Sequence, residues 1–133
     1  MTTCNTFISH SWKYGNHYST IVNFLNSDST FKWQDYSIPI DDPVHTNGTD
    51  ADLRAKLDSK IRMSSVVVLV GGVYASYSKW IDAEIDIAQK YNKPIITVLL
   101  RSAERSSDRA QSAATEVVAW QAKSIIEAIK RHY

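Results

Sequence analysis

Hydrophobic and polar residues alternate along the chain in two spacings, one typical of strands and one typical of helices. Residues 6–9 form a short run of the β type. The apolar positions after it recur at intervals of three, four and seven, which predicts an amphipathic helix. These positions are Tyr18, Ile21, Val22 and Leu25. Residues 31–38 predict a second strand, and a second amphipathic helix follows it, with its apolar positions at Leu53, Leu57 and Ile61.

The second half of the chain predicts strands of a more deeply buried type. Residues 64–72, SSVVVLVGG, form a continuous β-branched run without polar alternation, which is typical of a strand covered on both faces of a parallel sheet. A helix is predicted at 77–91, followed by a strand of the same buried type at 93–100. Residues 115–120 predict a short fifth strand before a closing helix that contains Ile125, Ile126 and Ile129.

This alternation of strands and helices predicts a three-layer α/β domain of the flavodoxin-like class, with a mostly parallel five-stranded sheet and helices on both faces. The length of 133 residues fits a single domain, 1–133. In such sheets, ligands bind beyond the carboxyl ends of the strands, where the strand order reverses. For the order 2-1-3-4-5, that point lies between the first strand, which ends near Ser9 and His10, and the third, which ends near Gly71 and Gly72.

Composition narrows the function mainly by exclusion. A net charge of +1 gives no field that would indicate nucleic acid or a membrane surface as a partner. The chain starts without a basic segment followed by a long apolar stretch, and nowhere do about 18 apolar residues run together, so we predict a cytoplasmic protein. Cys4 is the only cysteine, which excludes an internal disulfide, and we interpret it as structural.

One acidic residue in the predicted helix at 77–91 lies on the apolar side. At about 100° per residue, Glu84 falls in the middle of the apolar arc. That arc contains Trp80, Ile81, Ile85, Ile87, Ala88 and Tyr91, and the opposite side contains Asp82, Asp86, Gln89 and Lys90. A carboxylate buried without partners is costly, so such a residue is normally paired, hydrogen-bonded or lining a cleft. Its position alone leaves a structural and a functional role equally open.

Other polar groups carry weaker signals. His10 could carry a proton, bind a ligand or be an ordinary loop residue. A Ser/His/Asp triad is disfavoured, because Ser9 and His10 are adjacent and point to opposite sides of an extended chain. Asp41, Asp42 and His45 lie in a Pro-containing loop without recognisable ligand spacing, so we interpret them as solvated and predict no metal site.

Two other functions of this fold do not match the chain. Gly71 and Gly72 follow a strand, but they fit neither the spaced dinucleotide fingerprint nor a phosphate-cradling loop, and they predict a tight turn. A phosphoacceptor receiver needs an acidic pair after the first strand and an Asp after the third. The chain has Ser-His and Gly-Gly at those places.

Three segments of the chain resemble TIR-like domains: FISHSW at 7–12, FKWQDYSIPIDDPVH at 31–45 and YSKWIDAEIDIAQKYNKPII at 77–96. More specifically, the chain is similar over nearly its whole length to the short TIR proteins, of the ThsB type, of bacterial Thoeris anti-phage defence. The resemblance implies an enzyme that cleaves NAD at the nicotinamide–ribose bond. NAD is then a substrate, no cofactor is needed, and a cyclic or acceptor-conjugated ADP-ribose product signals to a downstream effector. Self-association is a further expectation, because TIR domains often act through it.

The resemblance also assigns residues to the expected site. Glu84 matches the catalytic glutamate of the family, within the WxxxE motif at 80–84. The expected substrate-contacting residues come from the first box and from the segment around the start of the motif: Phe7, Ser9, His10, Tyr77, Ser78 and Trp80. Nicotinamide leaves from an oxocarbenium-like ribosyl centre, so a carboxylate near that centre favours the positive charge as it develops.

Two alternatives of different classes stay open. A non-catalytic TIR scaffold would work by association and keep Glu84 as a structural group. A nucleoside deoxyribosyltransferase-like enzyme would combine the same sheet with Glu84 as a covalent nucleophile at a sugar.

Overall fold

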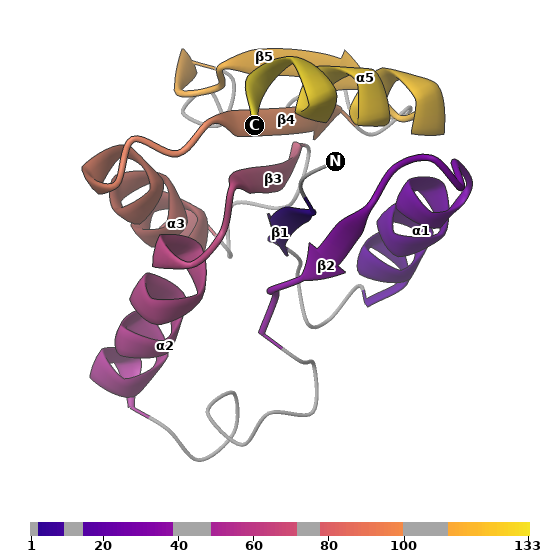
Figure 1. The fold of residues 1–133 in the computed structure, drawn as a ribbon. Coiled ribbons are helices and arrows are strands. Elements are labelled where there is room, and N and C mark those ends of the chain that lie inside the picture. Colours follow the sequence, from indigo (N-terminus) through magenta and orange to yellow (C-terminus); the bar gives the residue numbers. More distant parts are fainter. Residues whose placement is uncertain (1–2, 10–14, 39–48, 72–77, 100–111) are drawn as a thin grey trace.

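The computed structural model of the chain describes residues 3–9, 15–38, 49–71, 78–99 and 112–133, and for residues 15, 16, 71 and 78–80 it describes the backbone alone. Strands and helices alternate through these ranges (Figure 1). In chain order they are β1 (Cys4–Ile8), α1 (Gly15–Asn26), β2 (Trp33–Asp35), α2 (Asp50–Arg62), β3 (Val66–Gly71), α3 (Ser78–Lys90), β4 (Ile95–Leu99), β5 (Glu116–Ala119) and α5 (Ala122–His132).

The five strands form one sheet in the order β2-β1-β3-β4-β5, and every neighbouring pair is parallel. In the register of the central strands, Thr6 lies opposite Val66, and Val67 lies opposite Ile95. This order reverses between β1 and β3, as the sequence predicts. The flavodoxin-like α/β class and the parallel sheet are therefore confirmed.

Helices cover both faces of the sheet, and two apolar clusters fill the space between the layers. Val66, Val68 and Val70 of β3 belong to the cluster under α1 and α5, whereas Val67 and Leu69 belong to the cluster under α2 and α3. Because successive side chains of a strand point to opposite faces, this division means that β3 is buried on both sides. Figure 1 shows α2 and α3 side by side, with α1 on the other side of the sheet.

The edge strand β2 is shorter than predicted. The prediction covered residues 31–38, but only Trp33–Asp35 pair with β1. The Asp35 carboxylate accepts a hydrogen bond from the Ser37 N–H at 2.9 Å, and this local turn competes with the extended conformation. The Ser37 hydroxyl then accepts a hydrogen bond from the Ile8 N–H at 2.9 Å. The chain after β2 is thereby tied to the carboxyl end of β1.

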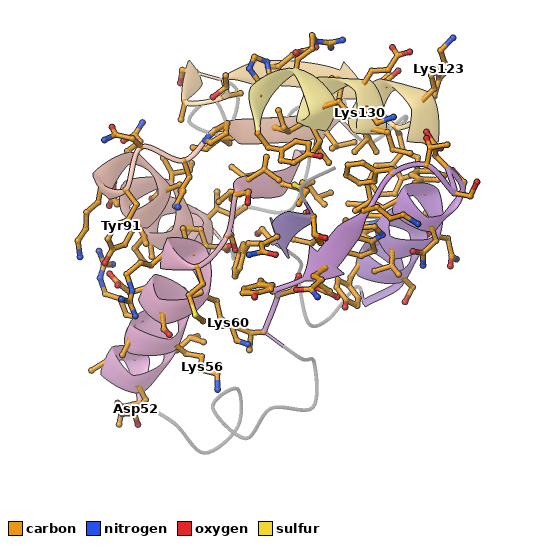
Figure 2. The ribbon with its side chains drawn as sticks, viewed as in Figure 1. Asp52, Lys56, Lys60, Tyr91, Lys123 and Lys130 are labelled. Atoms are coloured by element: carbon orange, nitrogen blue, oxygen red, sulfur yellow. The ribbon has the colours of Figure 1, made fainter. Side chains whose placement is uncertain are left out.

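A polar contact holds α3 against α2. The Tyr91 hydroxyl, just after α3, donates to Asp58 Oδ1 at 2.6 Å, and Lys90 Nζ lies 3.0 Å from Asp58 Oδ2. Figure 2 shows Tyr91 beside the two helices. The contact lies two helical turns from Glu84, so it fixes the far end of the helix that carries the candidate acid.

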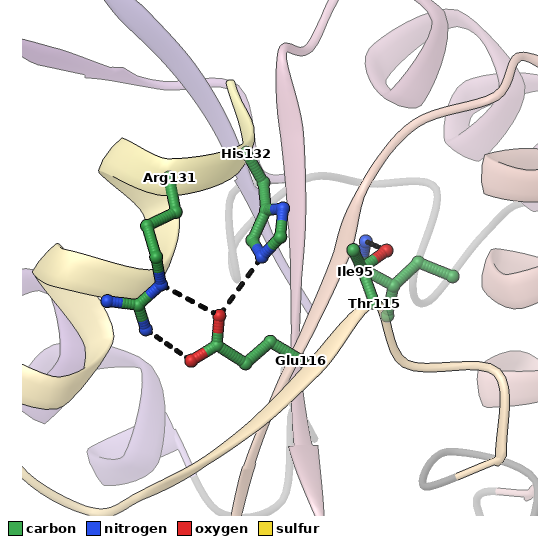
Figure 3. Close-up of polar contacts among 5 residues, drawn as sticks. All are labelled: Ile95, Thr115, Glu116, Arg131 and His132. Atoms are coloured by element: carbon green, nitrogen blue, oxygen red, sulfur yellow. Dashed lines mark hydrogen bonds and ion pairs between the residues drawn. The ribbon is translucent and has the colours of Figure 1, made fainter.

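The strand β5 and the end of α5 are also tied by charge. Glu116 accepts from Arg131 through both carboxylate oxygens, and its Oε1 lies 3.0 Å from His132 Nε2 (Figure 3). Basic residues at the end of the closing helix thus also bind the sheet. Through the ranges that the structure describes, each helix is too short or too polar to cross a bilayer.

Candidate active site

Helix α3 places Glu84 in the face that packs on the sheet. Glu84 is only 5% exposed, although it is acidic. The rest of that face is apolar and buried, and it includes Ile81, Ile85 and Ala88. The opposite side carries Asp86, Gln89 and Lys90, which are exposed, and Asp82 is half-buried. The predicted helix phase is therefore confirmed, together with the burial of Glu84.

The partner of Glu84 is Ser9, which directly follows β1. The Ser9 hydroxyl donates a hydrogen bond to Glu84 Oε1 at 2.9 Å, and Ser9 is 7% exposed. Its own N–H donates to the Val68 carbonyl at 2.8 Å, so the pairing between β1 and β3 continues through this residue. In an extended chain Ser9 shares a face with Phe7, which belongs to the apolar cluster under α2 and α3. Alternation along the strand thus directs the hydroxyl towards α3.

The pair lies at the place where this topology binds ligands. Ser9 directly follows β1, its N–H is bonded to β3, and these two strands are the neighbours between which the strand order reverses. Glu84 is in the second turn of α3, the helix that follows β3 in the chain. The carboxylate therefore lies beside the carboxyl ends of the strands.

The two oxygens of Glu84 have different surroundings. Oε1 accepts from Ser9, whereas Oε2 is buried and has no hydrogen-bond partner among the described residues. Burial raises the pKa of Glu84 to about 8, and the Ser9 hydrogen bond opposes this shift without cancelling it. The carboxyl group consequently changes its charge close to neutral pH, where small changes in its surroundings decide whether it is ionised.

Phe7 occupies a different environment from the one expected for a substrate contact. It is 2% exposed and belongs to the same apolar cluster as Val67, Ile81 and Ile85. Its burial supports a packing role under α3. The contact between Phe7 and a substrate stays a prediction.

The other predicted site residues are only partly described. Ser78 and Trp80 lie in the first turn of α3 by their backbone. His10 and Tyr77 lie outside the described residues, as do Asp41, Asp42 and His45. Among the residues that the structure does describe, no three His, Cys, Asp or Glu side chains cluster as a metal site would require.

The sequence did not predict that Ser9 and Glu84 bind each other. The structure shows that the Ser9 hydroxyl donates to the carboxylate, and the contact of Ser9 with a substrate stays a prediction. The signal was present in two separate patterns: Ser9 is two residues after the apolar Phe7 on one strand face, and Glu84 is on the apolar arc of the helix. To predict the contact from these two patterns, the distance between the sheet and α3 would also have to be known.

A cavity of about 500 Å³ lies at the amino ends of the strands, near the starts of β4 and β5. It is bordered by Gln89, Asn92, Lys93, Pro94, Ile95, Ala113, Thr115 and His132. Figure 3 shows His132 and Thr115 in this region, with the Ile95 N–H donating to the Thr115 hydroxyl at 3.1 Å. The cavity is open, and Lys93 and His132 border it beside the carboxyl ends of α3 and α5. Those helix ends favour cations, and Lys93 supplies one. The buried carboxylate of Glu84 lies at the other end of the strands, beside their carboxyl ends.

Comparison with known proteins identifies relatives by family and by fold. The family model described as "Thoeris protein ThsB, TIR-like domain" matches residues 7–105. No curated protein sequence matches the chain. A solved structure of the CMP N-glycosidase BcmB from Clostridium botulinum is 11% identical, with a TM-score of 0.53 over 96% of this chain and 98% of that one. A conserved protein from Enterococcus faecalis V583 is 14% identical, with a TM-score of 0.60 over 99% and 100% of the two chains. At these identities, both structures show a shared fold.

Proposed function

Because the chain belongs to the family of TIR-like domains of Thoeris protein ThsB, we propose that it is an NAD-consuming enzyme of Thoeris-type anti-phage defence. It cleaves the nicotinamide–ribose bond and releases an ADP-ribose-derived signal, either cyclic or joined to an acceptor. The observation that carries this proposal is the buried carboxylate of Glu84, bonded to Ser9 at the carboxyl edge of the sheet. A structural acid on this face would need partners for both oxygens, and Oε2 has none among the described residues.

In the proposed reaction, the bond between the nicotinamide nitrogen and the ribose carbon C1′ breaks, and its electron pair stays with nicotinamide. The ring loses its positive charge as C1′ gains one. Ionised Glu84 stabilises this developing charge, and the apolar surroundings of α3 strengthen the attraction, because little water screens it. The cation at C1′ is then captured by water, by another group of the same ADP-ribose or by an external acceptor, and a nucleophile that carries a proton releases it to solvent. Because the pyridinium is already a good leaving group, the reaction needs no general acid.

The charge state of Glu84 links binding to reaction. With a pKa of about 8, the free carboxyl is largely protonated at neutral pH. A positive nicotinamide ring near the carboxylate favours its ionised form, and the proton passes to solvent. Binding of a cationic substrate therefore prepares the group that stabilises the transition state.

A second candidate is an N-glycosidase or glycosyl transferase that acts on another nucleotide or nucleoside. One protein of the same fold is named a CMP N-glycosidase, and the bond that its name implies is chemically related to the nicotinamide–ribose bond. A buried glutamate also serves such an enzyme, as a nucleophile or as an electrostatic group. Incubation with CMP, or with a deoxynucleoside and a free base, separates this candidate from an NAD-consuming enzyme.

A non-catalytic TIR scaffold is the remaining alternative, and it predicts no turnover of any of these compounds. The proposed enzyme works in the cytoplasm, and self-association is proposed for it as for other TIR domains. Sedimentation of the parental protein at several concentrations, with and without NAD, tests the self-association separately from the chemistry.

The central experiment measures nicotinamide release from NAD by the purified chain, alone and with extract from phage-infected cells. Mass spectrometry of the second product distinguishes ADP-ribose, a cyclic isomer and a conjugate. We expect one nicotinamide for each ADP-ribose-derived product. Release of cytosine from CMP without consumption of NAD would favour the second candidate, and no turnover under either condition would favour the scaffold.

A further inference from the structure

The hydroxyl group of Ser9 has one proton, and the structure assigns it to Glu84 Oε1 at 2.9 Å. A hydroxyl donates one hydrogen bond and accepts two, so Ser9 has no proton left for a substrate while this bond exists. We infer that Ser9 is a positioning residue that holds Glu84 through Oε1 and leaves Oε2 as the oxygen that accepts from substrate hydroxyl groups. This inference rests on the proposed function and gives Ser9 a role beside the predicted substrate contact, in which its oxygen could only accept.

The donor is held firmly enough to orient a long side chain. The Ser9 N–H is bonded to the Val68 carbonyl at 2.8 Å, and the Ile8 N–H beside it is bonded to the Ser37 hydroxyl at 2.9 Å. These two bonds fix the end of β1 towards β3 on one side and towards the chain after β2 on the other. A glutamate has several rotatable bonds, and one hydrogen bond from a fixed donor reduces the orientations that its carboxylate takes. The groups that hold Ser9 therefore also determine the position of Glu84.

The two carboxylate oxygens then have separate roles. Oε2 is buried and lacks a hydrogen-bond partner within the described residues, and such an atom calls for a ligand, a proton or water. The neighbouring acids Asp82 and Asp86 project from other sides of α3, so neither competes with Glu84 for a group that binds at Oε2. A ribose hydroxyl that donates to Oε2 would satisfy this oxygen and would place the negative charge beside C1′.

The same bond has an electrostatic effect that a purely structural contact would lack. A hydroxyl that donates to a carboxylate stabilises its ionised form. The hydrogen bond from Ser9 therefore lowers the pKa of Glu84, whereas burial raises it. Removal of the hydroxyl should therefore make Glu84 harder to ionise. Two neighbouring serines allow a matched comparison, because Ser9 and Ser37 are each 7% exposed and each hydroxyl takes part in one bond near β1.

The test compares Ser9→Ala with Ser37→Ala in the full chain. The pKa of Glu84 is measured by carbon-detected NMR of the side-chain carboxyl, a readout that needs no turnover. Ser9→Ala is expected to raise this pKa and to move the acid limb of NAD turnover to higher pH. At a pH well below the pKa, raising the pKa of the free enzyme by about one lowers its ionised fraction, and hence kcat/KM, roughly tenfold. Ser37→Ala removes a hydroxyl that does not contact Glu84, so it is expected to lower stability and to change the Glu84 pKa much less than Ser9→Ala does.

Two further variants make the result decisive. Ser9→Thr keeps the hydroxyl and should restore the parental pKa. Ser9→Cys keeps nearly the same volume with a weaker donor, so it should raise the pKa even if Ser9→Ala does not fold. A folded Ser9→Ala or Ser9→Cys protein with an unchanged Glu84 pKa overturns the positioning role, whether or not NAD is consumed. A raised pKa in a protein that never consumes NAD supports the positioning role and removes the proposed substrate.

Discussion

Ser9 and Glu84 are 75 positions apart in the chain, and a hydrogen bond of 2.9 Å joins the Ser9 hydroxyl to Glu84 Oε1. The bond connects the end of β1 with the second turn of α3 across one face of the sheet. It satisfies one oxygen of a buried carboxyl group. The other oxygen has no partner among the described residues, and the pKa of the group is raised to about 8. A ligand that binds beside Glu84 can therefore change its charge.

The buried carboxyl should make the stability of the protein fall as the pH rises. The pKa of Glu84 is raised from 4.5 to about 8, so the folded protein binds a proton more tightly than the unfolded chain between those values. The free energy of unfolding is then highest below about pH 4.5, falls as the pH rises to about 8 and levels off above it. This contribution is on the order of 5 kcal/mol across the window.

Glu84→Gln lacks this titration and isolates it from the other groups. The unfolding free energy of Glu84→Gln minus that of the parent should increase between pH 5 and pH 8.5, as measured by urea denaturation. Asp86→Asn changes an exposed acid on the same helix, and its curve should run parallel to that of the parent. A constant difference between Glu84→Gln and the parent across this range would mean that Glu84 ionises normally.

The pH dependence of turnover should differ between the free enzyme and the substrate complex. Ionised Glu84 is the active form in the proposed reaction, so kcat/KM for NAD should rise with pH through an apparent pKa near 8. The acid limb of kcat should lie at lower pH, because the bound nicotinamide ring is positive and favours the ionised carboxylate. Initial rates from pH 5 to pH 9 measure both. A rate that falls over this range would indicate that protonated Glu84 acts as a general acid.

Much of the fold could be predicted because its signals are local. The β-branched run at 64–72 identifies a strand buried on both faces, and the helical spacing around Glu84 identifies the buried side of α3. The length of β2 could not be predicted in this way, because the turn between Asp35 and Ser37 competes with a strand-like sequence. The contact of Ser9 with Glu84 depends on how far α3 lies from the sheet, and no local pattern carries that distance.

The contact between Tyr91 and Asp58 should contribute to stability and not to turnover. Tyr91→Phe removes the hydroxyl that donates to Asp58 at 2.6 Å, which should lower the unfolding free energy by about 1 kcal/mol. Glu84 lies two turns away on α3, so nicotinamide release should stay at the parental rate. Thermal unfolding and turnover of the same preparation check both. A large loss of activity without unfolding would show that the far end of α3 controls the site.

His10 is expected to contribute to turnover. His10→Ala is expected to slow nicotinamide release without unfolding the domain, because His10 directly follows Ser9 in the chain. Turnover, product identity and thermal unfolding are compared with those of the parent. Unchanged turnover and product would make His10 an ordinary loop residue.

The strongest prediction concerns the activity of Glu84→Gln. The substitution keeps the side-chain volume and the helix propensity nearly constant while it removes the charge, so the fold should survive. Removal of a buried carboxylate should leave the stability at neutral pH equal to or higher than that of the parent. Loss of one preorganised electrostatic group should raise the reaction barrier by about 3 to 4 kcal/mol, which slows turnover roughly a hundredfold to a thousandfold. Activity and stability should therefore change independently.

Measurement of NAD binding distinguishes a role of Glu84 in the transition state from a role in substrate binding. The charge of Glu84 acts most strongly on the transition state, so Glu84→Gln should still bind NAD while kcat falls. Nicotinamide release, NAD binding by calorimetry and thermal unfolding are measured on one preparation, with extract from phage-infected cells included in the turnover assay. Asp82→Asn and Asp86→Asn are the matched controls on the same helix, and each should retain most of the activity. A folded Glu84→Gln protein that consumes NAD at the parental rate would show that Glu84 is structural. A loss of activity in the controls as large as that of Glu84→Gln would show that the acid on the buried face has no special function.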